Sequence, residues 1–185
     1  EELWQDLEMC QKKLSDYLDT KRMAFPRFFF ISDGELLEIL GTSDPTKIQK
    51  HMLKLFDNCA GLTFARANKV ITGMTSAERE SYTMEDNVTV EGPVEVYMTA
   101  VELEMRQSLQ AITKRGTFMY AQAALRSADD RVQWIDDEIG MVGLAGSQIW
   151  WTWEVEDAFA KVKDCRRVRE SSLVWSALSW LPPIN

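Results

Sequence analysis

An aromatic turn near the start of the chain constrains the fold more than any other feature. Residues Phe25–Phe30 read Phe-Pro-Arg-Phe-Phe-Phe, so four large rings fall within six residues. The residue before a proline avoids the α region, and Phe25-Pro26 is therefore expected to stop a preceding helix. Rings this closely spaced can bury a large area where two helical segments meet. The sequence thus predicts a packed corner between helices.

The segment before this turn has the pattern of one long helix, from about Glu2 to Met23. Apolar residues recur at alternating spacings of four and three, which places them on one stripe. The stripe consists of Leu3, Leu7, Cys10, Leu14 and Tyr17. The chain lacks an initial Met and starts already in this helical register. We interpret that start as a fragment of a longer protein rather than a complete gene product.

Two shorter helices are predicted after the turn. Ser32, three residues before Glu35, forms a capping box for the first, and Gly41 is expected just after its end. Asp44-Pro45 is a cap followed by proline at the first helical position, which predicts the next helix. The predicted buried face of that helix is Ile48, Met52, Leu55 or Phe56, and Cys59, with Gly61 closing it.

From Leu62 the apolar period changes and β-branched and aromatic residues dominate. Strands are predicted at 62–64, 69–72, 81–84 and 87–90, with Glu85-Asp86 expected as a turn. These segments indicate one or two short β-hairpins between about 62 and 91. A sheet this small is marginal alone and is expected to lie on the helices.

Helical spacing returns after Gly92-Pro93 and is expected to end at Gly116, with 117–126 again helical. Ser127 and Asp130 form another possible cap. The glycines at 140, 143 and 146 indicate either close approach of a neighbouring backbone or a break between two helices.

A last helix is predicted from Ser147 to about Lys163. The residues expected to face inward are Ile149, Trp150, Trp153, Phe159 and Val162. Trp150, Trp151 and Trp153 cannot all face one core. At least one should meet a second layer or a partner, although packing within this chain is the simpler explanation for most of them.

Composition excludes several function classes. The net charge of −8 argues against general binding of nucleic acid or of anionic membranes, because both require a basic surface. No apolar run reaches the roughly 18 residues of a membrane-spanning helix. The cysteines at 10, 59 and 165 are widely spaced and odd in number, which predicts buried free thiols.

No catalytic, cofactor-binding or metal-binding residue is predicted, and the chain is not expected to be an enzyme. The spacing from Gly41 to Lys47 does not match a phosphate-binding loop. His51 has no nucleophile or orienting acid at helical spacing, so we interpret it as exposed or capping. Asp136-Asp137-Glu138 point in different directions on a helix and indicate a solvated acidic face, not a metal cage.

Several motifs, in order, resemble the linker region of axonemal-type dynein heavy chains, N-terminal to the AAA+ ring. They are the helix 7–22, the turn and helix Phe25–Leu40, the segment Thr72–Glu80, the helix from Val94 to Leu109, and Ser147–Glu156. The resemblance implies a mainly α fold with a small antiparallel β element (α+β), built of helical bundles and hairpins. It implies a connecting helix at 1–24, a linker subdomain at 25–163 with its hairpin at about 62–91, and a divergent segment at 164–185.

The chain departs from the resemblance at two places. Where the family has Gly in its Ser-x-Glu-Gly-Glu turn, this chain has Arg79, which is strained if φ is positive there. After Lys163 the family pattern is lost. The last segment carries an apolar stripe that is expected to be buried against this chain's own helices or a partner. The stripe is Leu173, Val174, Ala177, Leu178 and Leu181, with Trp175 and Trp180 beside it.

By resemblance, the function is that of a non-catalytic mechanical linker in ciliary or flagellar motility. The alternative is a short dynein-like protein acting as a static scaffold in a ciliary complex. The implied partners are the AAA+ ring of the same heavy chain and other axonemal proteins, with no nucleic acid and no membrane, and the implied location is the axoneme and cytoskeleton. The candidate structural and interaction residues are Phe25, Pro26, Arg27, Phe28, Phe29, Phe30, Glu78, Glu80, Trp150, Trp151, Trp153, Trp175 and Trp180.

Overall fold

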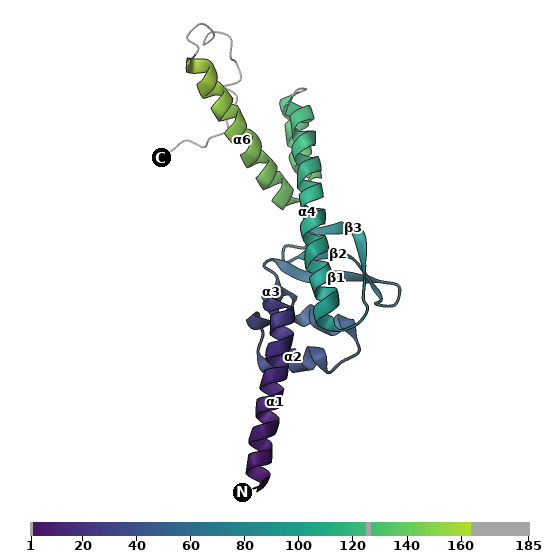
Figure 1. Cartoon of the computed structure of the whole chain (residues 1–185). Coiled ribbons are helices and arrows are strands. Elements are labelled where there is room, and N and C mark those ends of the chain that lie inside the picture. Colours follow the sequence, from purple (N-terminus) through teal and green to yellow (C-terminus); the bar gives the residue numbers. More distant parts are fainter. Residues whose placement is uncertain (1, 125–126, 164–185) are drawn as a thin grey trace. The chain divides into compact units, whose positions relative to one another are not determined.

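The computed structural model describes residues 2–124 and 127–163. It is mainly helical with one small antiparallel sheet, which confirms the predicted fold class (Figure 1). The chain divides into two compact units, Glu1–Gln110 and Ala111–Asn185. The long helix α4 (Val94–Ala124) contributes residues to both units.

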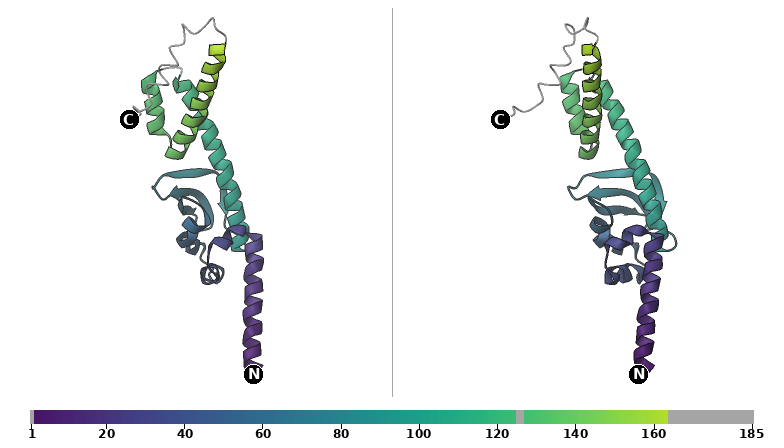
Figure 2. Two further views of the ribbon diagram at one scale, coloured as in Figure 1. Left: turned by 90° about the vertical axis from the view of Figure 1, so that its left-hand side faces the viewer. Right: turned by 60° about the vertical axis from the view of Figure 1, so that its left-hand side comes forward.

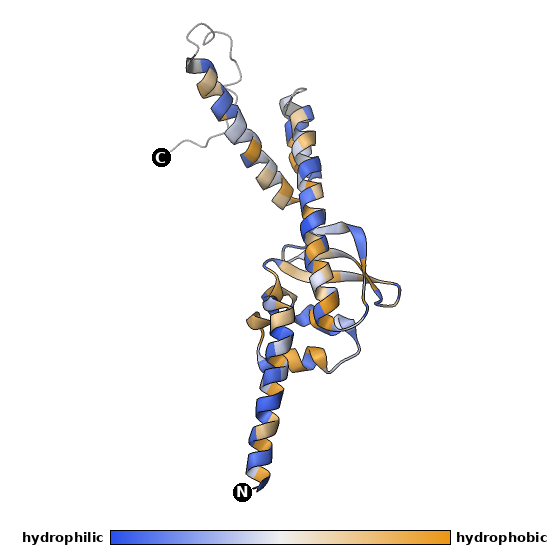
Figure 3. Ribbon diagram, in the orientation of Figure 1, coloured by the Kyte–Doolittle hydropathy of each residue, from blue (hydrophilic) through white to orange (hydrophobic). Residues whose placement is uncertain are grey.

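Helix α1 (Glu2–Ala24) ends directly before Phe25-Pro26, as the proline predicts, and a 3₁₀ helix η1 (Pro26–Phe30) follows. The apolar stripe of α1 faces solvent. Leu3 is 80% exposed and Leu7 is 65% exposed. Leu18 is the buried residue of the helix. In Figure 3, apolar residues are interspersed with hydrophilic residues along the whole of α1. Only the last turns of α1 therefore contribute to the core of the first unit.

The predicted caps of the next two helices are confirmed. Helix α2 (Asp33–Leu40) has the full Ser32 and Glu35 capping box, and Gly41 is its C-cap residue with φ −81°. Asp44 accepts a hydrogen bond from the Thr46 N–H at 3.0 Å. The segment it caps is a 3₁₀ helix η2 (Pro45–His51), followed by one turn of α-helix, α3 (Met52–Leu55). The expected end at Gly61 is wrong, because strand β1 already begins at Cys59.

Three antiparallel strands in the order β1-β2-β3 form two hairpins: β1 (Cys59–Ala65), β2 (Val70–Ser76) and β3 (Ser81–Thr89). The turn expected at Glu85-Asp86 is wrong. This dipeptide lies in a bulge of β3, between the pairs Ile71–Val88 and Gly73–Thr83. Its backbone N–H groups donate to side chains of α4, Glu85 to Ser108 Oγ at 2.8 Å and Asp86 to Glu104 Oε1 at 3.1 Å. The interruption of the strand pattern at Glu85-Asp86 is therefore a bulge that contacts α4, and not a turn.

The core of the first unit joins the N-terminal helices, the sheet and the first half of α4. In Figure 2 this half of α4 runs alongside the sheet, where the bonds from β3 attach it. The fully buried side chains come from every one of these elements. They include Phe28, Leu36, Ile48, Met52, Leu55, Ile71, Met98 and Val101.

The second unit consists of the end of α4, helix α5 (Ala128–Asp137) and helix α6 (Gly140–Lys163). The expected helix end at Gly116 is wrong, since α4 continues to Ala124. Gly116 instead permits close packing, because a β-carbon there would lie 2.3 Å from Val142 Cγ1. The predicted Ser127 cap is confirmed by its hydrogen bond from the Asp130 N–H at 3.1 Å.

Both explanations of the glycine spacing apply, at different glycines. Helix α5 ends before Glu138, whose backbone is extended, and α6 starts at Gly140, so a break lies there. Gly146 lies inside α6, where a β-carbon would be 2.9 Å from the Trp134 ring. A β-carbon added at Gly143 would have no neighbouring atom within 4 Å.

The predicted inward face of α6 is largely wrong. Ile149, Trp153 and Phe159 are 50%, 57% and 67% exposed. The inner face is instead the line Val142, Gly146 and Trp150, with residues four apart. The Val162 side chain lies outside the described residues. None of the helices in the described ranges is long and apolar enough to span a membrane.

Candidate functional site: the joint at the aromatic turn

The aromatic turn joins α1 to the rest of the first unit. Phe25 and Phe28 are 1% and 0% exposed, and their rings meet edge to face with centroids 4.9 Å apart. Phe25 also lies 6.4 Å from the Phe56 ring. Phe29 and Phe30 are 60% and 66% exposed. Two of the four rings therefore build the corner, and the other two form its outer surface.

Arg27, between the buried rings, connects the turn to α3 and α4. Its Nη1 donates to the Leu55 carbonyl oxygen at 2.8 Å, and its Nε lies 3.3 Å from Glu102 Oε2. The guanidinium carbon sits 4.5 Å from the centroid of the Phe56 ring. A planar guanidinium suits this combination of ion pair, carbonyl bond and ring stacking. Pro26 begins η1 and is itself exposed.

Two basic residues fix the last turn of α1. Lys21 Nζ pairs with Glu95 Oε1 of α4, and this hydrogen bond raises the pKa of Lys21. Arg22 Nη2 donates to Asp33 Oδ1 at 2.5 Å, which raises the pKa of Arg22. The first pair joins residues 74 apart in sequence and the second joins residues 11 apart, so neither belongs to a local helix motif. The joint residues that sequence reasoning missed are Lys21, Arg22, Asp33, Glu95 and Glu102.

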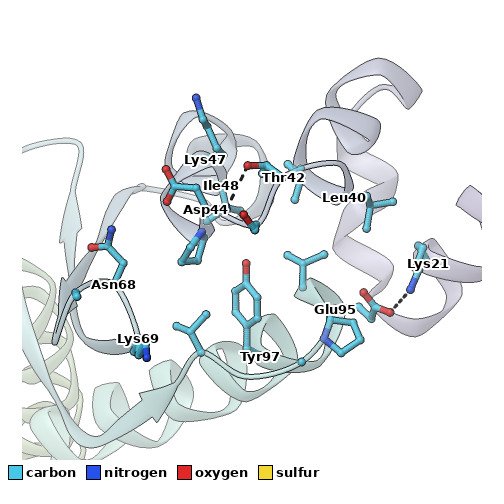
Figure 4. Close-up of a pocket in the computed structure, with 18 of the residues that line it drawn as sticks. Lys21, Leu40, Thr42, Asp44, Lys47, Ile48, Asn68, Lys69, Glu95 and Tyr97 are labelled. Carbon is cyan, nitrogen blue, oxygen red and sulfur yellow. Dashed lines mark hydrogen bonds and ion pairs between the residues drawn. The ribbon is translucent and has the colours of Figure 1, made fainter.

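A cavity of about 690 Å³ lies beside this joint. Figure 4 shows the Tyr97 side chain pointing into it and the Lys21–Glu95 pair at its edge. Burial raises the pKa of Tyr97 to about 12. Further lining residues are Thr42, Asp44, Lys47, Asn68 and Lys69. The lining also carries the Ser43 hydroxyl, but no histidine and no cysteine of the described residues lines it.

The other polar residues considered in the sequence are His51 and the acidic run Asp136-Asp137-Glu138. His51 is buried, against the expectation of an exposed or capping residue, with Nδ1 3.5 Å from Glu35 Oε1. It occupies the N-cap position of α3, but its side chain makes no capping hydrogen bond. Asp136 and Asp137 are exposed. Among the described residues, no group of three His, Cys, Asp or Glu side chains could hold a metal ion.

The described cysteines are free, as expected, but only one is buried. Burial raises the pKa of the Cys59 thiol to about 11. Cys10 is exposed because it lies on the uncovered stripe of α1. Cys165 lies outside the described residues.

The turn between β2 and β3 contains Glu78 and Glu80. Arg79 between them has φ +70°, the left-handed conformation that the glycine of the family turn would favour. A hydrogen bond with the Asn58 side chain lowers the pKa of Glu78. Glu80 is half-buried, and its N–H donates to Ser76 Oγ at 3.1 Å. These residues form the turn itself and lie on unit 1.

The tryptophans of α6 have three different environments. Trp150 is half-buried, donates Nε1–H to the Thr117 carbonyl oxygen at 2.8 Å and stacks on Tyr120. Trp153 is 57% exposed and touches Trp150 edge to face. Trp151 is 54% exposed, which makes it about as open to solvent as Trp153. Trp175 and Trp180 lie outside the described residues.

Known proteins share this sequence over most of its length. Residues 1–116 match the family described as dynein heavy chain, N-terminal region 2. The chain is 60% identical over 162 residues to the dynein-1-alpha heavy chain, flagellar inner arm I1 complex, of Chlamydomonas reinhardtii, which covers 88% of this chain and 3% of that protein. It is 51% identical over 160 residues to dynein axonemal heavy chain 10 of Homo sapiens, covering 85% of this chain and 4% of that protein.

A third relative is the dynein beta chain, ciliary, of Heliocidaris crassispina, 37% identical over 164 residues, or 85% of this chain and 4% of that protein. The chain thus spans about 3–4% of the length of these relatives. The matched family and the relatives together show that the chain belongs to the dynein heavy chain family, and that its residues 1–116 correspond to N-terminal region 2.

Proposed function

We propose that the chain is a non-catalytic mechanical linker segment of an axonemal-type dynein heavy chain. In this role it transmits the ATP-driven motion of the AAA+ ring in a cilium or flagellum. Its partners are then the ring of the same heavy chain and other axonemal proteins. The names of the relatives, which are flagellar, ciliary and axonemal heavy chains, support this location.

The joint at the aromatic turn is the observation that carries the proposal. One end of α1 is fixed by two buried rings and by the contacts of Lys21, Arg22 and Arg27. The first turns of the same helix carry no buried side chain. A helix of 23 residues is about 35 Å long. A long helix held rigidly at one end is suited to transmit a displacement.

Stiffness at the joint follows from its packing and its charge pairs. Close-packed interiors have low compressibility and transmit strain. Removing one partner of a partly buried charge pair leaves the other charge uncompensated, so each pair resists being opened. The joint therefore combines apolar packing with directional contacts from Arg27 to both α3 and α4.

The proposal assigns no nucleotide site to this chain. The sequence lacks the Gly-rich loop and lysine that cradle phosphates, and the matched N-terminal region is not the ATPase ring. Calorimetry of the isolated chain with ATP and magnesium should show no binding at micromolar concentrations. Saturable heats in that range would overturn this part of the proposal.

The mechanical role is tested in a full-length heavy chain that carries a weakened joint. Arg27→Ala removes the contacts to Leu55 and Glu102 and should lower microtubule gliding velocity while the ATPase rate per head is retained. Arg106→Ala is the matched control, because Arg106 pairs with the same Glu102 at 2.7 Å but is 71% exposed. Unchanged velocity in the Arg27→Ala protein, with hydrogen exchange showing a loosened turn, would contradict a mechanical role.

The native size of the polypeptide separates this proposal from a static scaffold. A polypeptide detected in cilia at many times the 21.3 kDa of this chain supports a heavy-chain segment. A native species near 21.3 kDa would instead favour the short scaffold protein.

A further inference from the structure

Helix α6 has an apolar stripe on the side opposite its inner face. Leu144, Trp151 and Phe159 are 70%, 54% and 67% exposed. They are seven and eight residues apart, close to two turns each at about 3.6 residues per turn, so they share one line along the helix. Val155 lies on the same line and is half-buried. These four residues are called the outer stripe.

The inner face of α6 points in a different direction and is already occupied. Val142 is 0% exposed, and Gly146 packs against the Trp134 ring. Trp150 donates its hydrogen bond to the Thr117 carbonyl oxygen from this side. A helix that is apolar on two faces is typical of a buried position between two layers. The described part of the second unit provides one of those layers.

The first half of α6 also lacks charge. From Ile139 to Trp153 the sequence contains no Asp, Glu, Lys or Arg. Large apolar groups gathered on an exposed face indicate an interface. The absence of charge favours a partner that is itself apolar and uncharged, because it would leave no ion unpaired on burial.

The last segment of this chain has the matching chemistry. Residues 171–185 contain no charged residue, and their apolar stripe runs from Leu173 to Leu181. Eight residues of helix rise about 12 Å, which is enough to cover the rise of about 10 Å from Leu144 to Trp151. The apolar stripe of the last segment is thus long enough to cover the first part of the outer stripe, and it has the same apolar character.

The connection between them is long enough for the chain to turn back. Helix α6 is described to Lys163, and residues 164–170 precede the apolar segment. Seven extended residues span at most about 25 Å, whereas antiparallel helices need connections of only about two to eight residues. The segment can therefore reach the uncharged half of α6 in an antiparallel direction.

We propose that residues 171–185 dock as an amphipathic helix on the outer stripe of α6. Leu173, Leu178 and Leu181 would then cover Leu144, Trp151 and Val155, and the stripe would become an interior layer of the second unit. This docking does not depend on the mechanical role proposed above, and failure of either one leaves the other standing.

Hydrogen exchange of the complete 185-residue chain tests the docking. In the wild-type protein the amides of 173–181 should exchange slowly, at a rate independent of protein concentration. Leu144→Glu or Trp151→Glu should accelerate their exchange at least tenfold. Ile149→Glu is the matched control, because Ile149 is 50% exposed on another face of the same helix, and it should leave protection of the segment unchanged.

Each other outcome overturns the proposal. Unprotected amides at 173–181 in the wild-type protein exclude docking. Protection that grows with concentration, together with a dimer in sedimentation, assigns the stripe to a second copy of the chain. Protection that survives both outer-stripe substitutions places the segment elsewhere. Amides of α5 report folding of the second unit in each variant, so a misfolded variant is recognised by lost α5 protection and replaced by the milder Leu144→Gln.

Discussion

Arg79 holds a backbone conformation that suits glycine better. The Ser76 carbonyl oxygen accepts from the Arg79 N–H at 3.1 Å, and the Ser76 N–H donates to the Glu80 carbonyl oxygen at 2.7 Å. These two hydrogen bonds and the φ of +70° at Arg79 define a three-residue hairpin loop. The last residue of such a loop has a left-handed backbone conformation and is usually Gly. The departure from the family motif is therefore located at a strained residue.

Arg79→Gly should stabilise the protein. A β-carbon in the left-handed region costs about 1–2 kcal/mol, and the greater freedom of glycine in the unfolded chain offsets roughly 0.5–1 kcal/mol of that gain. The expected net effect is an increase of about 0.5–1 kcal/mol in the free energy of unfolding, measured by urea denaturation. Arg79→Ala is the control, since it removes the charge but keeps the β-carbon, and an equal gain there would refute the strain argument.

Phe28 and Phe29 are adjacent and have opposite environments, which allows a paired test. Phe28→Ala should lower the free energy of unfolding by about 3–5 kcal/mol, because a fully buried ring is lost and a cavity remains. Phe29→Ala should change it by less than about 0.5 kcal/mol, as expected for an exposed position. Denaturant midpoints that shift equally in the two variants would contradict the assignment of Phe28 to the core.

At the scale of elements, α2 and α3 are linked through Glu35. Its Oε1 lies 2.5 Å from Lys54 Nζ, and its Oε2 accepts from the Ser32 N–H at 3.0 Å. The bond to Lys54, followed by those to Ser32, lowers the pKa of Glu35 from 4.5 to about 2. Glu35 thus joins the capping box of α2 to a lysine of α3.

The pKa of Glu35 predicts a pH-dependent contribution to stability. Because the pKa is lower in the folded state, the contribution is fully present above pH 4.5 and is lost as the pH falls to about 2. Wild-type protein should exceed Glu35→Gln in stability at pH 7, with the difference shrinking across this window. Urea titrations at several pH values measure it, and a difference that stays constant down to pH 2 would exclude the carboxylate as its source.

Helix starts could be predicted from sequence far better than helix ends and faces. Ser32, Asp44 and Ser127 act as caps because the signal is a side chain bonding to its own local backbone. Gly116 was expected to end a helix, but its role is set by Val142, 26 residues away. The same contrast between local and distant signals holds at the joint. The end of α1 is predicted by the adjacent residues Phe25 and Pro26, whereas the contact of Arg27 with Glu102 forms only once the chain is folded.

Periodicity correctly places apolar residues on shared stripes but does not say which stripe is covered. The stripe of α1 is regular and exposed, and α6 has two apolar faces of which one is packed. A sequence pattern is a property of one element, and burial is a property of its neighbours. The mainly α class, fixed by local patterns, was predictable for that reason, and the inward face of α6 was not.

At the scale of the whole molecule, the two units have cores of different size. In the described part of the second unit, the buried large apolar residues are Ile112, Trp134 and Val142. The first unit buries many more, from α1, η1, α2, η2, α3, the sheet and α4. Since local opening free energies follow buried apolar contact, the second unit is expected to open more readily than the first.

Trp134→Ala should therefore unfold the second unit alone. The substitution removes a ring that is 5% exposed, its hydrogen bond to the Gly116 carbonyl oxygen at 2.9 Å, and its contact with Gly146. Loss of a buried aromatic side chain costs about 3–5 kcal/mol, a large share of what so small a core can provide. Native-state hydrogen exchange should show α5 and α6 losing protection while β1 and β2 keep theirs. If the sheet loses protection to the same extent, the chain folds as one cooperative unit. If α5 and α6 keep theirs, further contacts stabilise the second unit, and the outer stripe of α6 is where those contacts would form.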